Sequence, residues 1–117
     1  MKVYVATKFE NGPRARQVMD ALEAQGFVIT YDWTPELGET LEQAVADVDG
    51  VRAADVLVVL MEENYDYQGT LIEIGIALGA QIPVLVVGDA YDHAVFFKHP
   101  LVRRVTAAEL NIPPHQP

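Results

Sequence analysis

Val56-Leu57-Val58-Val59-Leu60-Met61 is an unbroken run of apolar side chains near the middle of the chain. Because the run offers no polar position to water, it is typical of a parallel strand that is buried on both faces of a sheet. Consecutive parallel strands are joined by crossover connections, usually helices, which cover those faces. The run therefore predicts an α/β domain with residues 56–61 in the interior of its sheet.

Strand and helix patterns alternate on both sides of this run. The other predicted strands are residues 2–6, 27–31 and 84–87, with a short edge strand around Val105. The predicted helices are one from Ala15 that ends before Gly26, one over 39–54, one over 70–80, a short one within 92–104, and a single turn from Thr106 to Leu110. This alternation predicts right-handed βαβ units and one flavodoxin-like domain, a parallel five-stranded sheet in the order 2-1-3-4-5 with helices on both faces.

The expected domain covers residues 1–110, and residues 111–117, which are rich in proline, are expected to form a loose C-terminal tail. In the helix over 39–54 the apolar residues form one stripe, which should face the core. The stripe consists of Leu41, Ala44, Val45, Val48 and Val51. The helix over 70–80 is apolar nearly all round and is expected to be well buried.

Composition limits the function classes. The 117 residues suffice for one domain, and the absence of cysteine excludes disulfides, thiolate chemistry and cysteine-ligated zinc. We expect no metal and no cofactor. Seventeen acidic residues against eight basic ones give a net charge of −9, which argues against a nucleic-acid polymer as partner but not against a small anionic ligand. No signal peptide or membrane span is visible, so a cytoplasmic location is expected.

Ligands of such a sheet bind beyond the carboxyl ends of its strands, here after Ala6 and Met61. The second of these loops leads into Gly69-Thr70-Leu71-Ile72-Glu73-Ile74-Gly75, where Glu73 is the only charged residue before Pro83. One interpretation is a capping box, in which Glu73 bonds back to the start of the helix near Thr70. The other is that Glu73 lies beside the ligand as a nucleophile, kept ionised by the helix N-terminus.

The stretch from Gly69 to Ala77, followed by Gln81-Ile82-Pro83-Val84, resembles the signature of the nucleoside 2-deoxyribosyltransferase family. Val3-Tyr4-Val5-Ala6 is similar to the family's opening strand, and 47–56 to its helix and strand that carry an Asp. The resemblance implies that Glu73 is the nucleophile, that Tyr4 contacts it, and that Asp47 handles the base. Family members usually place an Asp directly before the Gly-Thr pair to hold sugar hydroxyls; here Asp66 lies further back, ahead of Tyr67 and Gln68.

Breaking an N-glycosidic bond builds positive charge at C1′ of the sugar, which a carboxylate can stabilise or attack to form a glycosyl-enzyme. The departing base needs a proton, so a second acid is required, and Asp47 is the candidate. The alternatives are that Asp47 is a solvated acid on a helix face and that Tyr4 is simply a core residue. The predicted catalytic residues are therefore Glu73, Asp47 and Tyr4.

The predicted substrate-binding residues come from the first and third loops and from the regions after the second and fourth strands. They are Thr7, Lys8, Arg14, Trp33, Asp66, Gly69, Thr70 and His99. Trp33 is expected to stack on a base or close the site; it could equally fill a surface groove. Lys8, Arg14 and Arg16 form a basic cluster that could bind a phosphate, or the arginines are merely solvated. His99 lies in a region that neighbouring subunits contribute in related enzymes, although simple packing is the alternative.

Three functions remain open at this point. A second base attacking the glycosyl-enzyme makes the protein a transferase, and water makes it a hydrolase. The resembling set includes hydrolases of nucleoside 5′-monophosphates, which the basic cluster would favour. A nucleotide-binding module without turnover is the third possible function.

We also predict a homodimer or larger homo-oligomer, since Val95-Phe96-Phe97 and the apolar helix over 70–80 are hard for a small monomer to cover.

Overall fold

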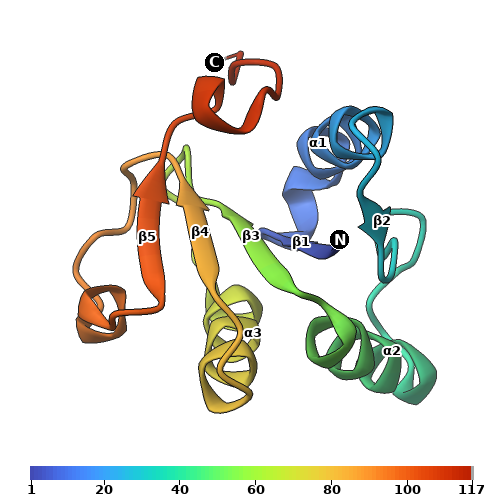
Figure 1. Cartoon of the computed structure of the whole chain (residues 1–117). Helices are drawn as coiled ribbons and strands as arrows, with labels where there is room; N and C mark the ends of the chain where they lie inside the picture. The colour runs from blue at the N-terminus through green and yellow to red at the C-terminus, as the bar shows by residue number, and fades with distance from the viewer. Residues whose placement is uncertain (117) are drawn as a thin grey trace.

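The computed structural model describes residues 1–116 and contains one five-stranded parallel sheet in the order β2-β1-β3-β4-β5, as predicted (Figure 1). The strands are β1 (Lys2–Ala6), β2 (Val28–Ile29), β3 (Val56–Leu60), β4 (Val84–Val87) and β5 (Val102–Val105). The helices are α1 (Gly12–Ala24), α2 (Leu41–Ala53) and α3 (Gln68–Gly79), with short 3-10 turns η1 (Phe9–Asn11), η2 (Val95–Lys98) and η3 (Ala108–Leu110).

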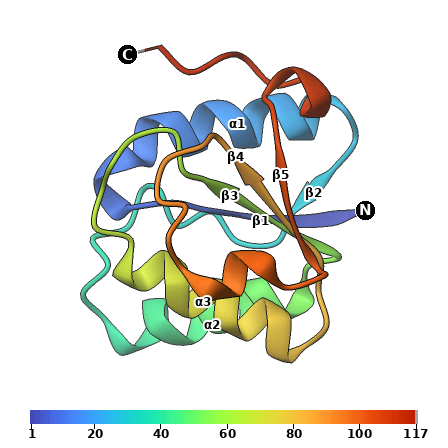
Figure 2. The ribbon, with the colours of Figure 1, turned by 90° about the vertical axis from the view of Figure 1, so that its left-hand side faces the viewer.

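The sheet lies between two helical layers. Figure 2 shows α1 on one face, together with η3 and the C-terminal segment, and α2 and α3 on the other face. The interior strands β1 and β3 carry most of the fully buried aliphatic residues, among them Val5, Leu57 and Val59. The apolar run that predicts an interior strand therefore does lie inside the sheet, between β1 and β4.

Some element boundaries differ from the predicted ones. β2 is only two residues long, because it is an edge strand and the chain turns toward α2 after it; the Thr30 hydroxyl donates to the carbonyl of Gly50. α1 begins at Gly12, ahead of Ala15. Pro13 is acceptable there, because the backbone N–H groups of the first helical turn have no acceptor within the helix and proline lacks only that N–H. α3 begins at Gln68, two residues before the predicted start.

Only one residue of the predicted apolar stripe of α2 faces the core. Val51 is fully buried and meets the sheet together with Gly50, whereas Leu41, Val45 and Val48 are exposed. A Cβ atom on Gly50 would lie 3.0 Å from the Tyr4 ring, so α2 approaches the sheet closely only on this side and the stripe is turned outward. The expectation of a well-buried α3 is also only partly right, because Ile72 is exposed.

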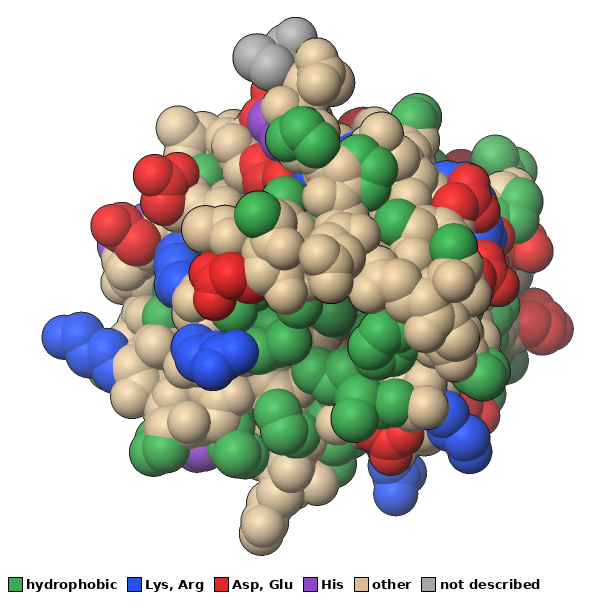
Figure 3. All heavy atoms as spheres, turned by 45° about the horizontal axis from the view of Figure 1, so that its top comes forward, with side chains coloured by type: hydrophobic (Ala, Val, Ile, Leu, Met, Phe, Trp, Pro, Cys, Tyr) green, Lys and Arg blue, Asp and Glu red, His purple; other side chains and the backbone are tan. Residues whose placement is uncertain are grey.

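The C-terminal region packs on the domain as far as it is described. The predicted turn at 106–110 is present, and Thr106 and Glu109 bond to each other's backbone N–H groups. Ile112 in the predicted tail is buried, whereas Pro117 lies outside the described residues. Within residues 1–116, no helix is long and apolar enough to cross a membrane. Figure 3 shows acidic and basic side chains interspersed around the face in view.

Candidate active site

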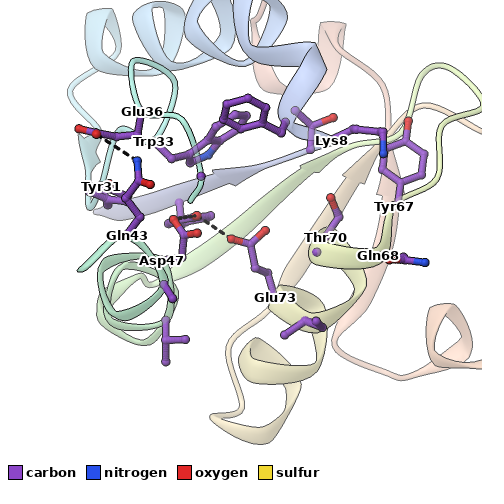
Figure 4. Close-up of a pocket in the computed structure, with 18 of the residues that line it drawn as sticks. Lys8, Tyr31, Trp33, Glu36, Gln43, Asp47, Tyr67, Gln68, Thr70 and Glu73 are labelled. Atoms are coloured by element: carbon purple, nitrogen blue, oxygen red, sulfur yellow. Dashed lines mark hydrogen bonds between the residues drawn. The ribbon is translucent and has the colours of Figure 1, made fainter. Parts of the chain in front are cut away.

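A pocket of about 640 Å³ opens beyond the carboxyl ends of β1 and β3, between α2 and α3 (Figure 4). Its polar and aromatic lining residues are Tyr4, Thr7, Lys8, Phe9, Glu10, Tyr31, Trp33, Glu36, Gln43, Asp47, Asp66, Tyr67, Gln68, Thr70 and Glu73. The pocket lies where a sheet of this strand order is expected to bind ligands.

The three predicted catalytic residues meet in this pocket from three different elements. The Tyr4 hydroxyl of β1 lies 2.6 Å from Oε2 of Glu73 in α3 and 3.2 Å from Oδ1 of Asp47 in α2. Tyr4 is only 1% exposed. The missing side chain of Gly50 lets the Tyr4 ring lie against α2, so that one hydroxyl reaches both carboxyl groups.

Burial dominates the ionisation of this group. Desolvation raises the pKa of Glu73 to about 8; the hydrogen bond from Tyr4 opposes the shift, and the nearby charge of Asp47 adds to it. Desolvation also raises the pKa of Asp47, again opposed by the Tyr4 hydrogen bond. The pKa of Tyr4 is raised as well, by burial first and then by the two carboxylates.

These shifts correct the expectation that the helix N-terminus keeps Glu73 ionised. Since α3 begins at Gln68, Glu73 lies beyond the first turn, where the influence of the helix dipole has largely fallen off. The capping box is absent for the same reason: Tyr67 is the N-cap residue and Thr70 is already inside the helix. Within the described residues, the buried Thr70 hydroxyl has no hydrogen-bond partner at all. Glu73 is therefore not a helix cap.

Aromatic residues form another part of the pocket lining. Trp33 is buried, and its indole N–H donates to the carbonyl of Val5 over 2.7 Å, which fixes the ring against the sheet. Phe9 lies next to it, with the ring centroids 6.3 Å apart and the planes tilted by 36°. In Figure 4, Trp33 lies on the Asp47 side of Glu73, and Lys8 and Thr70 lie on the other side.

The predicted basic cluster does not assemble. Lys8 lines the pocket, and its ammonium donates to the carbonyl of Asp66 over 2.9 Å. Arg14 is buried outside the pocket lining, where its guanidinium forms two hydrogen bonds with the carboxylate of Glu62, at 2.9 and 2.7 Å. Arg16 pairs with the acidic residues Asp20, Glu23 and Asp32. Sequence spacing alone did not reveal these acidic partners.

The other predicted binding residues divide in the same way. Thr7, Asp66, Gly69 and Thr70 line the pocket with Lys8 and Trp33, whereas His99 does not. The sequence analysis missed Glu36 and Gln43, which also line the pocket. The side-chain amide of Gln43 donates to the carboxylate of Glu36 over 3.0 Å. The one signal for Gln43 was the pattern Thr40-x-x-Gln43, a capping box that the structure contains.

Comparisons with known proteins point to one family. The family model described as nucleoside 2-deoxyribosyltransferase matches residues 3–103. A CMP N-glycosidase from Clostridium botulinum is similar with a TM-score of 0.64 and 18% identity, over 91% of this chain and 88% of that one. A 2-deoxyribosyltransferase from Bacillus psychrosaccharolyticus is similar with a TM-score of 0.63 and 20% identity, over 99% of this chain and 100% of that one. These identities show a shared fold. No curated protein matches the chain.

The half-buried Glu73 makes stability depend on pH. Its pKa rises from 4.5 to about 8 on folding, so the folded state holds the proton more tightly than the unfolded state. Stability from this group is thus fully present below about pH 4.5 and is lost as the pH rises toward 8. Glu73→Gln removes the ionisation, and we expect it to raise Tm at pH 8 by at least about 3 °C, with the gain shrinking toward pH 5.

Thermal melts followed by circular dichroism over this pH range measure the effect. Glu42→Gln, which alters an exposed acid at the start of α2, is the matched control and should show no such pH-dependent gain. A lower Tm for Glu73→Gln at every pH would mean that the carboxylate stabilises the folded state, and would contradict the burial argument.

Proposed function

The chain belongs to the nucleoside 2-deoxyribosyltransferase family of enzymes, and on that premise we propose that it breaks the N-glycosidic bond of a nucleoside or nucleotide with Glu73 as the nucleophile. The observation that carries this proposal is the pair of carboxyl groups, Glu73 and Asp47, on one buried tyrosine hydroxyl at the pocket wall. The chemistry requires two acids with different roles, and the pocket supplies both.

Each carboxyl group has its own part in the reaction. Glu73 attacks C1′, the bond from C1′ to the base nitrogen breaks, and its electron pair stays with the base. Asp47 gives the base a proton, so that the base leaves as a neutral molecule. The covalent glycosyl-Glu73 ester is then attacked from the opposite side, and two inversions retain the configuration at C1′.

The arrangement of the lining supports one orientation of the substrate. Trp33 lies on the Asp47 side of Glu73 and offers an aromatic surface against which a planar base can stack. Lys8 and Thr70 lie on the other side, where the sugar and any substituent at its 5′ position would extend. Asp66, the acid nearest to the missing sugar-binding Asp, also lines the pocket and is the candidate to hold a sugar hydroxyl.

Glu73→Gln tests the assignment directly, because it keeps the shape of the side chain and removes the anion. We expect loss of turnover by at least about 1000-fold, with a folded protein by circular dichroism. The assay incubates a panel of nucleosides and 5′-monophosphates, with and without a second base, and scores free base and exchanged nucleoside by mass spectrometry. Exchange identifies a transferase, and release of base alone identifies a hydrolase.

Two further measurements complete this test. A quenched reaction of the wild-type enzyme should contain protein heavier by one glycosyl group, located on Glu73 by peptide mapping. Glu42→Gln should retain full turnover, since Glu42 is exposed outside the pocket lining. Near-full turnover of Glu73→Gln would show that another group is the nucleophile, and Asp47 or Asp66 would become the residue to examine.

One observation favours a second candidate function, hydrolysis of nucleoside 5′-monophosphates. The Thr70 hydroxyl is buried without a partner in the described residues, in the first turn of α3, whose leading N–H groups have no partner within the helix. A phosphate oxygen would satisfy the hydroxyl and these amides together. Lys8 lines the same pocket and supplies positive charge.

If a phosphate binds here, a 5′-monophosphate should bind about ten-fold more tightly than its nucleoside, and added salt should weaken this preference. Thr70→Val and Lys8→Ala should each reduce the preference. Arg16→Ala should leave it unchanged, because Arg16 is paired with acidic residues outside the pocket. Calorimetric titration measures the affinities of the wild type and of the three variants for both ligands. Equal affinities for the two ligands at low salt would favour unphosphorylated nucleosides.

We further propose that the protein is a homodimer or larger homo-oligomer. The outward stripe of α2, formed by Leu41, Val45 and Val48, is continuous with the pocket, since Val48 lines it. Ile72 of α3 is also exposed and lines the pocket from the other helix. A second copy seated on α2 and α3 would cover this apolar surface and close the pocket.

Multi-angle light scattering at micromolar concentration should therefore give at least twice the mass of the chain. Val45→Glu with Ile72→Glu should shift the protein to a monomer, because two buried charges on each subunit would be desolvated at the interface. Val28→Glu, at an apolar residue on the edge strand outside the pocket lining, is the control and should keep the oligomer. A wild-type monomer at this concentration would refute the proposal.

A further inference from the structure

A single hydroxyl hydrogen faces two carboxyl groups in this pocket. The Tyr4 oxygen lies 2.6 Å from Glu73 Oε2 and 3.2 Å from Asp47 Oδ1, and both distances are within hydrogen-bond range. A phenol donates one hydrogen, so it can serve only one carboxylate at a time. The other contact is a hydrogen bond only if that carboxyl group carries a proton of its own and donates it to the Tyr4 oxygen.

The surroundings favour such a proton over two negative charges. The only cationic side chain among the lining residues is Lys8, and its ammonium is held by the Asp66 carbonyl at 2.9 Å and lies 3.6 Å from Glu10. The remaining titratable groups of the lining carry no positive charge. They are Glu10, Tyr31, Glu36, Asp66 and Tyr67. Two carboxylates that share a desolvated site without a cation bind one proton between them. The raised pKa values of Glu73 and Asp47 agree with this.

We propose that Glu73 and Asp47 share one proton and that Tyr4 transfers it from Glu73 to Asp47 before the glycosidic bond breaks. This inference rests on the proposed function and adds the origin of the proton that the base receives. It also assigns Tyr4 a role beyond holding Glu73 in place. Ring position is set by β1 and by Gly50, so the hydroxyl is fixed between its two partners.

The transfer is balanced in atoms and charge. The Glu73 carboxyl proton moves to the Tyr4 oxygen while the Tyr4 proton moves to Asp47 Oδ1, which leaves Glu73 as the carboxylate, Tyr4 as a neutral phenol and Asp47 as the acid. Glu73 then bonds to C1′, the C1′–N bond breaks, and the Asp47 proton passes to the base nitrogen. The triad carries one negative charge before and after, first on Asp47, next on Glu73, and finally on Asp47 again.

A shared proton gives a reason for a nucleophilic carboxyl group to lie half-buried beside a second acid. The proton that makes Glu73 unreactive in the empty pocket is the same proton that the leaving base requires. Glu73 therefore becomes anionic only as Asp47 becomes acidic, and neither activated group exists without the other. With one proton bound, the pocket without substrate avoids the cost of holding two desolvated negative charges.

One test needs no turnover. We would label the protein with ¹³C at the Glu and Asp side-chain carboxyl carbons and assign the signals of Glu73 and Asp47 from Glu73→Gln and Asp47→Asn. At pH 7 the two signals together should report one bound proton, and both should move in one step as that proton is lost near pH 8. In Tyr4→Phe the two signals should move in separate steps. Two fully ionised carboxylates at pH 7 would overturn the proposal.

A second test compares leaving groups that do and do not need a proton. The substrates are 2′-deoxyguanosine and 7-methyl-2′-deoxyguanosine, each with and without a 5′-phosphate; the methylated base is cationic and leaves without being protonated. Tyr4→Phe should lower kcat/KM at least about 100-fold for the unmethylated substrate and less than about 10-fold for the methylated one.

The controls separate this role from simple positioning. Asp47→Asn should follow the same substrate pattern as Tyr4→Phe, and Tyr65→Phe, which alters an exposed hydroxyl bonded to Glu63, should change neither substrate. Equal losses on both substrates would show that Tyr4 only positions Glu73, and would overturn the transfer. If the wild-type enzyme turns over no nucleoside or 5′-monophosphate of the panel, the proposed function fails, and the carboxyl titration still decides whether the proton is shared.

Discussion

β1 and β3 pair in parallel at the interior of the sheet, with Tyr4 opposite Leu57 and Ala6 opposite Val59. This pairing forces the chain to cross over between the two strands, and α2 lies in that crossover. It also brings the loops that follow both strands to the same edge. This one register brings together Tyr4 of β1, Asp47 of the crossover helix α2, and Glu73 of α3, which follows β3.

The site introduces an electrostatic cost at the centre of the molecule. Two acidic side chains lie on a nearly inaccessible phenol, with no cationic side chain in direct contact among the described residues. Two ionised carboxylates at this place would lower the stability of the fold, because desolvation disfavours their charged form. A carboxyl group with a raised pKa, such as that of Glu73, can change its protonation state when its surroundings change.

Two of the eight basic residues of this acidic chain, Arg14 and Arg104, hold loops. Arg14 fixes the start of the loop after β3 through Glu62, and Arg104 donates to the carbonyls of Gly88, Ala90 and Tyr91 after β4. Gly88 is needed there, because a Cβ atom at this position would lie 2.4 Å from the Met61 carbonyl oxygen. Lys8 is thus left as the cation of the pocket, and recognition of a phosphate would depend on backbone N–H groups and the Thr70 hydroxyl as well.

The sequence by itself determined the fold class and the strand order, through an apolar run at 56–61 and the alternation of strand and helix patterns. It also marked Glu73 as an acid isolated in an apolar helix, whereas Tyr4 and Asp47 were singled out by the resemblance to a known family. Only the tertiary structure decided which partners the charged and apolar side chains have. It pairs Arg14 with Glu62, 48 residues away, and it turns the stripe of α2 outward because Gly50 is the point of closest approach. It also raised the pKa of Glu73, since desolvation depends on everything packed around a group and not on its neighbours in the chain.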